Sequence, residues 1–320
     1  DEVKPGQVIA RRYFDRDLAI YRTEAGVLRV VDAFCPHMGG HLGRIGHVEG
    51  ESLRCGFHGF HFSTDGRCTD TPYEGPPPPR ARLEAWPMKE MAGLVLVWFD
   101  AQGRAPQWEV PHLDTEGWSD LTWRRYSIAT HPQETTENSV DFGHFTQVHD
   151  FDNGHIAREV EVDGPHLNTA YAVERHMPYL GLRFMPRFVM KVIYDVQVWG
   201  LGYSQVNVQL SQFGAELRFF VLPVAKDDGH IDLVLAGSIK KRFGPIDKLA
   251  RNIAHSYLCL EVEQDIVVWE TKIFQDPPAL ATGDGPVATY RRWAKQFYAP
   301  QNERARRPRP APRPVVSAAG

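Results

Sequence analysis

The sequence predicts an α+β fold in which a small all-β domain precedes an antiparallel sheet with one long helix. Short alternating or β-branched runs separated by turns fill residues 7–34 and 86–99, which is typical of a compact all-β domain. Residues 158–240 offer at least five strand candidates, and their alternation suits an antiparallel sheet with one buried face. Residues 245–274 read as one long helix opened by Pro245, since proline is favoured in a first turn.

The order of these segments divides the chain into three parts. We expect an all-β domain over residues 1–105, a second domain over residues 106–300 and an Arg/Pro-rich tail over residues 301–320. The second domain begins with a Trp- and Pro-rich connector, and the pattern then becomes helical over residues 132–150. Its clearest strands are 188–199, 202–210, 215–222 and 230–238.

Composition and charge exclude several classes of protein. Hydrophobic residues make up 42% and charged residues 24% of the 320 residues, as in an ordinary globular protein. A formal net charge of −4 argues against a general nucleic-acid binder. No apolar run approaches the roughly 20 residues that a membrane-spanning helix needs. The chain starts without the pattern of a secretory signal, and its four cysteines make no disulfide scaffold, so we expect a cytoplasmic protein.

Two short loops of the first domain offer metal ligands. Cys35 and His37 form a C-x-H pattern, and Cys55 and His58 form a C-x2-H pattern. Two Cys and two His can hold a tetrahedral zinc ion or a Rieske [2Fe–2S] cluster. Zinc fingers usually pair Cys with Cys and His with His along the chain. Here each loop is mixed, as a cluster with two Cys on one iron and two His on the other requires, so the sequence predicts a Rieske cluster.

A second group of metal ligands lies in the helical stretch. His144 and His149 are five residues apart, about 140° round an ideal helix, so they share a metal only if the helix is distorted or ends between them. Asp141, three residues before His144, falls on the same helix face. Two imidazoles and one carboxylate would make the facial triad of a non-haem Fe(II) oxygenase.

The carboxylate of that triad is expected in the long C-terminal helix. Glu261, Glu263 and Asp265 lie there among apolar residues. An acidic side chain buried in such surroundings is costly unless it binds a cation. Spacing alone does not choose among the three, and a solvated acidic face is the alternative for Glu261 and Glu263.

Together the two motifs resemble those of the catalytic subunit of Rieske non-haem iron oxygenases. The second motif reads N-x2-D-x2-H-x4-H and comprises Asn138, Asp141, His144 and His149. The resemblance covers nearly the whole chain. It implies that the second domain is a helix-grip fold, an antiparallel sheet around a long helix, and that it holds a mononuclear Fe(II).

The last third of the chain resembles the bacterial 3-ketosteroid 9α-hydroxylases and the animal cholesterol 7-desaturases. The similar segments are residues 264–269 with Lys272, then 283–286, 291–293 and 296–298, together with 35–40 in the first domain. In that group the Asp that follows Gln in the first of these segments is the third iron ligand. The resemblance therefore implies that Asp265 completes the triad of His144 and His149.

The resemblance implies the activity of a terminal monooxygenase. Such an oxidoreductase uses O2 and two electrons to oxidise a C–H bond of a bulky apolar substrate, here a steroid-like one, by hydroxylation or desaturation. A ferredoxin or a flavin reductase would supply the electrons, because the chain lacks a G-x-G-x-x-G fingerprint and so uses NAD(P)H only indirectly. The alternative is a Rieske O-demethylase or a tailoring monooxygenase of secondary metabolism that acts on an aromatic or polycyclic substrate. Two further alternatives are a Rieske electron carrier and a zinc-stabilised binding module. An electron carrier needs only about 100 residues, far fewer than this chain has, and a zinc module would contain no acid-labile sulfide.

Asp141 and Asn138 are the candidate catalytic residues beside the ligands. In the family the matching Asp also bonds a cluster His of the neighbouring subunit, which would be His58. Electrons would then cross between subunits of a head-to-tail homotrimer. Asn138 is expected either near the iron or as a helix-cap amide.

Overall fold

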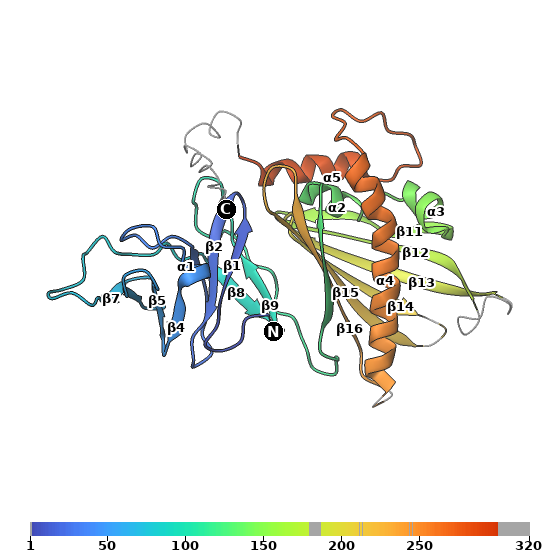
Figure 1. The fold of residues 1–320 in the computed structure, drawn as a ribbon. Helices are drawn as coiled ribbons and strands as arrows, with labels where there is room; N and C mark the ends of the chain where they lie inside the picture. Colours follow the sequence, from blue (N-terminus) through green and yellow to red (C-terminus); the bar gives the residue numbers. More distant parts are fainter. Residues whose placement is uncertain are drawn as a thin grey trace, which may run out of the picture.

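The computed structural model describes residues 2–178, 187–210, 212, 214–242, 244 and 246–299, and of residues 176–178 and 187–188 it describes the backbone alone. A β-rich N-terminal part is followed by a larger part built on one sheet and one long helix (Figure 1). Pro245 and the tail at 301–320, both named in the sequence-based prediction, lie outside the described residues.

Three antiparallel sheets form the N-terminal part. The first contains β1 (Val8–Tyr13), β2 (Arg16–Arg22) and β3 (Leu28–Asp32). The second contains β4 (His47–Glu49), β5 (Ser52–Arg54), β6 (His61–Phe62) and β7 (Cys68–Asp70), and the short helix α1 (Leu42–Ile45) precedes it. Their inner faces share one core that includes the cluster-loop residues Cys35 and Cys55.

The third sheet is the hairpin of β8 (Met88–Met91) and β9 (Leu94–Val97). Its two-residue turn is Ala92 and Gly93, and both have positive φ, 51° and 81°. That geometry matches the twist of a tight hairpin and favours glycine.

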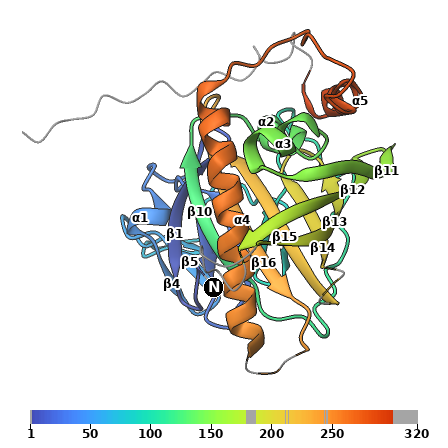
Figure 2. The same cartoon turned by 90° about the vertical axis from the view of Figure 1, so that its right-hand side faces the viewer.

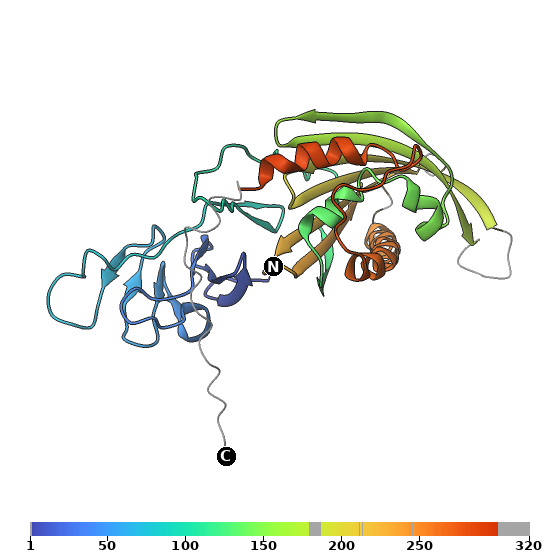
Figure 3. The same cartoon turned by 90° about the horizontal axis from the view of Figure 1, so that it is seen from above.

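The larger part contains one seven-stranded antiparallel sheet with the strand order β10-β16-β15-β14-β13-β12-β11. Its strands are β10 (Thr122–Ile128), β11 (Asp152–Asp163), β12 (His166–Pro178), β13 (Arg187–Trp199), β14 (Tyr203–Leu210), β15 (Ala215–Ala225) and β16 (Ile231–Ile239). The sheet curves round the long helix α4 (Ile246–Thr271), as Figures 2 and 3 show. This confirms the predicted α+β fold with an antiparallel sheet and a long C-terminal helix.

The helix α4 is fixed to the sheet by one buried face. Cys259, Val262 and Trp269 pack against Ile231 and neighbouring apolar residues of β16. Val262 follows Cys259 by three residues and Trp269 follows Val262 by seven, about two helical turns, so these side chains make an apolar stripe, which is the usual way a helix is held on a sheet. Among the described residues no helix is both long and apolar enough to cross a bilayer.

The helical stretch expected over residues 132–150 is two short helices, α2 (Pro132–Glu137) and α3 (Gly143–His149). The chain turns between them, and Val140 in this turn is fully buried. A Cβ on Gly285 would lie 2.6 Å from the Val140 carbonyl oxygen, so the loop before α5 (Val287–Ala294) packs directly on the turn. Long-range packing thus interrupts the helix, and Asp141 precedes α3 instead of sharing a helix face with His144.

The two parts meet where the β1–β2 turn touches the end of β15. The backbone N–H groups of Phe14 and Asp15 donate to the carbonyls of Ala225 and Lys226, at 2.8 and 2.9 Å. Beside them Tyr13 donates its hydroxyl to Asp232 at 3.1 Å. These bonds give the N-terminal part a fixed attachment to the sheet.

Candidate active site

Three of the predicted ligands converge in the larger part. His144 and His149 come from α3, and Asp265 comes from the buried face of α4. One ligand atom from each lies within 4.8 Å of the others. His149 Nε2 lies 3.2 Å and His144 Nε2 4.0 Å from Asp265 Oδ1. A Fe(II) ion with two imidazoles and one carboxylate fits this donor set and leaves further coordination positions open.

The helix α3 holds both imidazoles without a break. It runs from Gly143 to His149 and ends there because Asp150 adopts the left-handed conformation, with φ of 56°. The two rings are 5.1 Å apart between centroids and nearly perpendicular. The helix therefore ends at the second histidine and not between the two. The imidazole side chains are long enough to meet despite the angle that separates the two positions round the helix.

The outer ring nitrogens of the two histidines face different partners. His149 Nδ1 lies 3.0 Å from Gln264 Oε1, a hydrogen bond that fixes the ring. His144 Nδ1 lies 3.7 Å from Asp141 Oδ2, which is within ion-pair range but longer than a hydrogen bond. Burial alone would lower the pKa of His149, but the hydrogen bond and charge of Asp265 raise it. Gln264 had no role in the sequence-based prediction, although its place beside Asp265 was a usable signal.

Asn138 lies at the ligand cluster. Its Nδ2 donates to Asp265 Oδ2 at 3.0 Å and lies 3.2 Å from His144 Nε2. The same residue is the C-cap of α2. The cap bond is made by the backbone N–H of Asn138, so its side-chain amide does not cap the helix and instead orients the carboxylate that the two histidines face.

The three acidic residues of α4 have different surroundings. Asp265 is the one that meets the histidines. Glu263 accepts a hydrogen bond from Tyr126 at 2.7 Å on the outer side of the helix. Glu261 pairs with Arg175 of β12, and its side chain is only 20% exposed. The alternative of a solvated acidic face does not describe Glu261, and the sequence analysis did not identify Arg175 as its partner.

The cluster loops bring their ligands together in like pairs. Cys35 and Cys55 are both buried and close enough to share a hydrogen bond. The rings of His37 and His58 lie 4.7 Å apart between centroids. Burial, with Cys55 nearby, raises the pKa of Cys35 to about 11, so a bound cation is needed to hold the sulfur of Cys35 as a thiolate.

This arrangement fits a two-iron cluster and not a single zinc ion. A tetrahedral site would bring all four ligand atoms round one point, and among the described residues only the iron triad converges in that way. Pairs of Cys and pairs of His are what a Rieske cluster requires. A Cβ on Gly40 would lie 3.1 Å from Cys55 Sγ, so only glycine gives the Cys35 loop this close approach to the sulfur.

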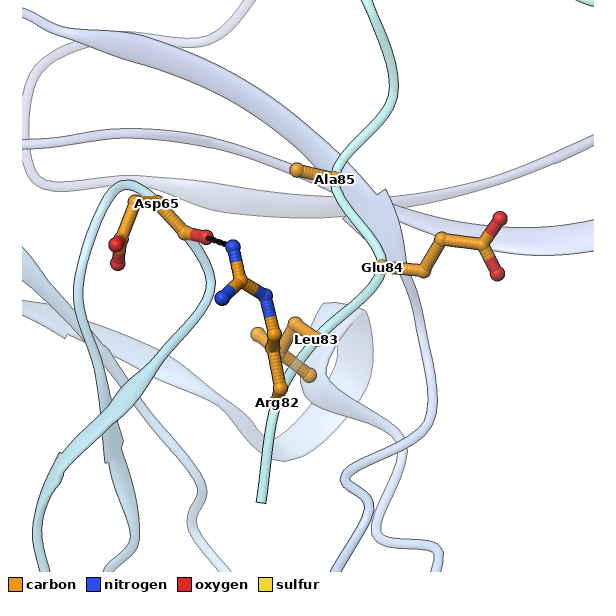
Figure 4. A pocket seen from close by; sticks show the side chains of 5 residues that line it. All are labelled: Asp65, Arg82, Leu83, Glu84 and Ala85. Atoms are coloured by element: carbon orange, nitrogen blue, oxygen red, sulfur yellow. Dashed lines mark hydrogen bonds between the residues drawn. The ribbon is translucent and has the colours of Figure 1, made fainter. Parts of the chain in front are cut away.

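A separate surface pocket lies in the N-terminal part (Figure 4). It is lined by residues 82–85 and Asp65, and Arg82 donates to the Asp65 carbonyl at 3.3 Å. None of its residues belongs to either group of ligands, so it is not part of the candidate site.

Fold and site together define a Rieske-type non-haem iron oxygenase. Residues 1–87 match the Rieske [2Fe-2S] domain and residues 97–298 match the 3-ketosteroid 9α-hydroxylase C-terminal domain. The chain belongs to this family of Rieske oxygenases, as the sequence-based resemblance predicted.

Relatives and solved structures agree with this assignment. A probable 3-ketosteroid-9α-monooxygenase oxygenase component from Rhodococcus rhodochrous is 31% identical, over 92% of this chain and 76% of the relative. A cholesterol 7-desaturase from Ciona intestinalis is 27% identical, over 95% of this chain and 67% of the relative. Dicamba monooxygenase bound to dicamba has the same fold, with a TM-score of 0.71 at 18% identity over 91% of this chain and 92% of the other.

Proposed function

We propose that the chain is the terminal oxygenase of a multicomponent system that hydroxylates or desaturates a steroid-like substrate. The observation that carries the proposal is the convergence of His144, His149 and Asp265 in a chain whose relatives act on steroids. When bound, the [2Fe–2S] cluster supplies single-electron transfer and the Fe(II) supplies O2 activation. The alternative, an O-demethylase or tailoring monooxygenase, has support only from structures that share the fold at 18% identity.

The residues round the triad have separate tasks in this proposal. Asp265, His144 and His149 would hold the Fe(II). Gln264 keeps the proton of His149 on Nδ1, so that Nε2 faces the metal. Asn138 restrains Asp265 Oδ2, which leaves Oδ1 directed toward the histidines.

In this proposal the substrate reaches the iron ligands on the side of α3 where aromatic rings of the core lie. Phe145 lies 4.6 Å from Tyr171, and Tyr171 lies 5.1 Å from Tyr194, between ring centroids. Phe151 lies 5.3 Å from His149, next to the iron site. Such surfaces favour a bulky apolar substrate and exclude water from its oxidised carbon.

Electrons enter through the N-terminal part. Cys35, His37, Cys55 and His58 would hold the cluster, and beside them Met38 and Phe57 are 65% and 56% exposed. A ferredoxin or flavin reductase would deliver the electrons, and NAD(P)H would be oxidised by that partner. None of the four cysteines forms a disulfide, as suits a cytoplasmic enzyme.

We further propose that the working form is a head-to-tail homotrimer. Exposed apolar residues lie beside His37 and His58 and also form a stripe on α4. Exposed apolar patches of this kind mark surfaces that bind another protein. The stripe consists of Ile246, Leu249, Ile253, Leu260 and Val267, which are 50% to 65% exposed. Asp141, whose side chain is 38% exposed next to His144, would accept a hydrogen bond from His58 of a neighbouring copy.

The test is anaerobic purification followed by metal analysis and turnover. We expect about three irons and two sulfides per chain, with the EPR signal of a reduced Rieske cluster. With a ferredoxin, its reductase and O2, a steroid panel should give hydroxylated or desaturated products. Zinc without sulfide would overturn the metal assignment, and demethylation of methoxyarenes in preference to steroid oxidation would overturn the substrate class.

A further inference from the structure

The helix α2 lies against α5 (Figure 1) and is buried although its side chains are polar. Its buried residues are Gln133, Glu134, Thr135, Thr136 and Glu137. A helix of six residues is not stable through its own hydrogen bonds, so contacts from outside hold it in place. None of these five residues is a metal ligand in the proposed function, which therefore does not account for their burial.

Arg291 of α5 binds the last residue of α2, Glu137, through two parallel hydrogen bonds. Nε donates to Glu137 Oε2 at 2.8 Å and Nη2 donates to Oε1 at 2.7 Å. The two side chains are only 14% and 9% exposed. The guanidinium is itself fixed, because Nη1 donates to the carbonyl of Gln275 and its carbon lies 4.6 Å from the centre of the Phe274 ring. Two bonds between fixed planar groups determine position as well as attraction.

Further contacts hold the rest of α2. Tyr290, the residue before Arg291, is fully buried and donates its hydroxyl to the Gln133 carbonyl at 3.1 Å. Glu134 pairs with Lys272, which directly follows α4. The helix α2 is therefore joined both to α5 and to the helix that carries Asp265.

The position of Glu137 determines that of Asn138, the next residue. The backbone N–H of Val140 donates to the Glu137 carbonyl at 3.0 Å, so the turn that contains Asn138 is tied to Glu137. The Asn138 amide in turn donates to Asp265 Oδ2 at 3.0 Å. A hydrogen bond of this length is lost when its atoms move about 1 Å apart, so a shift of that size at Glu137 would release the carboxylate of Asp265.

Stability does not account for the pair of Arg291 and Glu137. Replacing a buried ion pair by apolar residues of similar size is often neutral or stabilising. An apolar pair would fill the same space, but it would not supply the directional geometry of the two bonds. The pair is therefore explained by the position that it gives to the end of α2.

We propose that Arg291 is a positioning residue of the iron site. It acts through Glu137, whose place determines that of the Asn138 amide. In that place the amide keeps Asp265 Oδ2 occupied, so that Oδ1 is directed toward the histidines. This inference rests on the proposed function and deepens it, because it names a residue outside the ligand set that determines the geometry of that set.

The test measures Fe(II) affinity in the anaerobic, cluster-loaded protein by competition with a coloured chelator. The double variant Arg291→Met with Glu137→Met removes both charges at once and keeps the site filled, so it should fold. It should bind Fe(II) about 10-fold more weakly, as is typical when a group that orients a ligand is lost. The EPR signal of the iron site with nitric oxide should broaden, because the carboxylate of Asp265 is then less restrained.

Two single variants complete the series. Arg291→Lys keeps the charge but not the two-bond geometry, and it should bind Fe(II) about threefold more weakly than wild type. Arg292→Met is the matched control on the same helix, since Arg292 is exposed and donates to Thr289 at 3.0 Å. Its Fe(II) affinity and EPR signal should equal those of wild type.

Combination with Asn138→Ala separates positioning from a general loss of packing. If Arg291 acts through Asn138, the double replacement should change Fe(II) affinity less than about twofold in the Asn138→Ala background. Wild-type affinity in the double variant, or an equal loss with and without Asn138, would overturn the proposal. If the double variant does not fold, Arg291→Lys is carried through the same comparison with the same two outcomes. Wild type that binds no Fe(II) would instead refute the proposed function, so the two failures are distinguishable.

Discussion

Gln264 and His149 meet across the contact between α4 and α3, with Gln264 Oε1 3.0 Å from His149 Nδ1. The amide oxygen only accepts, so the imidazole carries a proton on Nδ1, and in the metal-loaded enzyme Nε2 would be the nitrogen that binds the iron beside Asp265. Two neighbouring residues of α4 therefore contact both ring nitrogens of His149. Gln264 fixes the tautomer, and Asp265 faces the other nitrogen at 3.2 Å.

Gln264→Leu should weaken Fe(II) binding about 10- to 100-fold, because the ring of His149 loses its restraint. Competition with a coloured chelator measures the affinity, and the sulfide content reports that the cluster is intact. Gln264→Glu keeps an acceptor at the same place and should stay near wild type. Wild-type affinity in the Leu variant would show that the hydrogen bond does not position His149.

Asp265→Ala should abolish the mononuclear site and leave the cluster, so that iron falls from about three to about two per chain. The reason is that Asp265 supplies the only carboxylate within 4.8 Å of both histidine ligand atoms in the described part of the chain. Glu263→Ala is the matched control, since Glu263 bonds Tyr126 outside the site. If Asp265→Ala retains three irons, the triad is wrong.

Gly40→Ala should impair the cluster and leave the Fe(II) site unchanged. Its Cβ would lie 3.1 Å from Cys55 Sγ and 3.2 Å from Phe57 Cβ, so one loop must shift at a cost of about 1–3 kcal/mol. Absorbance and EPR of the reduced cluster measure the effect. Gly283→Ala, with nothing within 4 Å of its Cβ, is the control. A normal cluster in Gly40→Ala would mean that the loop yields at no cost.

Asp141→Asn should keep both metals and lose most of the turnover that is coupled to electron delivery. The charge of Asp141 faces His144 Nδ1 at 3.7 Å and is the group proposed to meet His58 of a neighbouring copy. Single-turnover and steady-state rates, with iron and sulfide counts, separate electron transfer from metal loss. Full activity in this variant would refute the proposed hydrogen bond between Asp141 and His58 of a neighbouring copy.

Alkaline pH should weaken the contact between the two parts of the chain. Burial, together with the charge of Asp232, raises the pKa of Tyr13 to about 12. The fold thus favours the neutral phenol, and this contribution is complete below about pH 10 and is lost as the pH rises through about 12. Between about pH 9 and pH 11, wild type should lose about 1 kcal/mol more unfolding free energy than Tyr13→Phe.

Urea unfolding at the two pH values measures this difference. The remaining tyrosines with raised pKa values are common to both proteins, so their effects cancel in the comparison. Parallel losses in wild type and Tyr13→Phe would show that the hydroxyl of Tyr13 does not respond to the interface.

Local patterns in the sequence predicted what local structure determines. The mixed loops at Cys35 and Cys55 are encoded by residues close together in the chain, and the structure places their side chains in like pairs. Asp265 was assigned by family resemblance, since spacing did not separate it from its acidic neighbours. The structure now brings it to the two histidines.

What the sequence did not reveal depends on partners far away in the chain. The interruption between α2 and α3 follows from the packing of Gly285 on Val140, which no helical periodicity contains. Glu261 resembled a surface acid until the fold placed Arg175 beside it. A three-residue acidic pattern is the same whether its members face solvent, a cation or a metal, and only tertiary packing separates those cases.

The ligands of the two metal sites are distributed very differently along the chain. The cluster loops lie close together near the start, within one small β-rich part. The iron triad joins α3 to α4, with six strands of the sheet between them in sequence. The cluster loops therefore need only the N-terminal part of the chain. The triad needs both ends of the larger part, so any fragment of the chain that ends before α4 lacks Asp265 and with it a complete iron site.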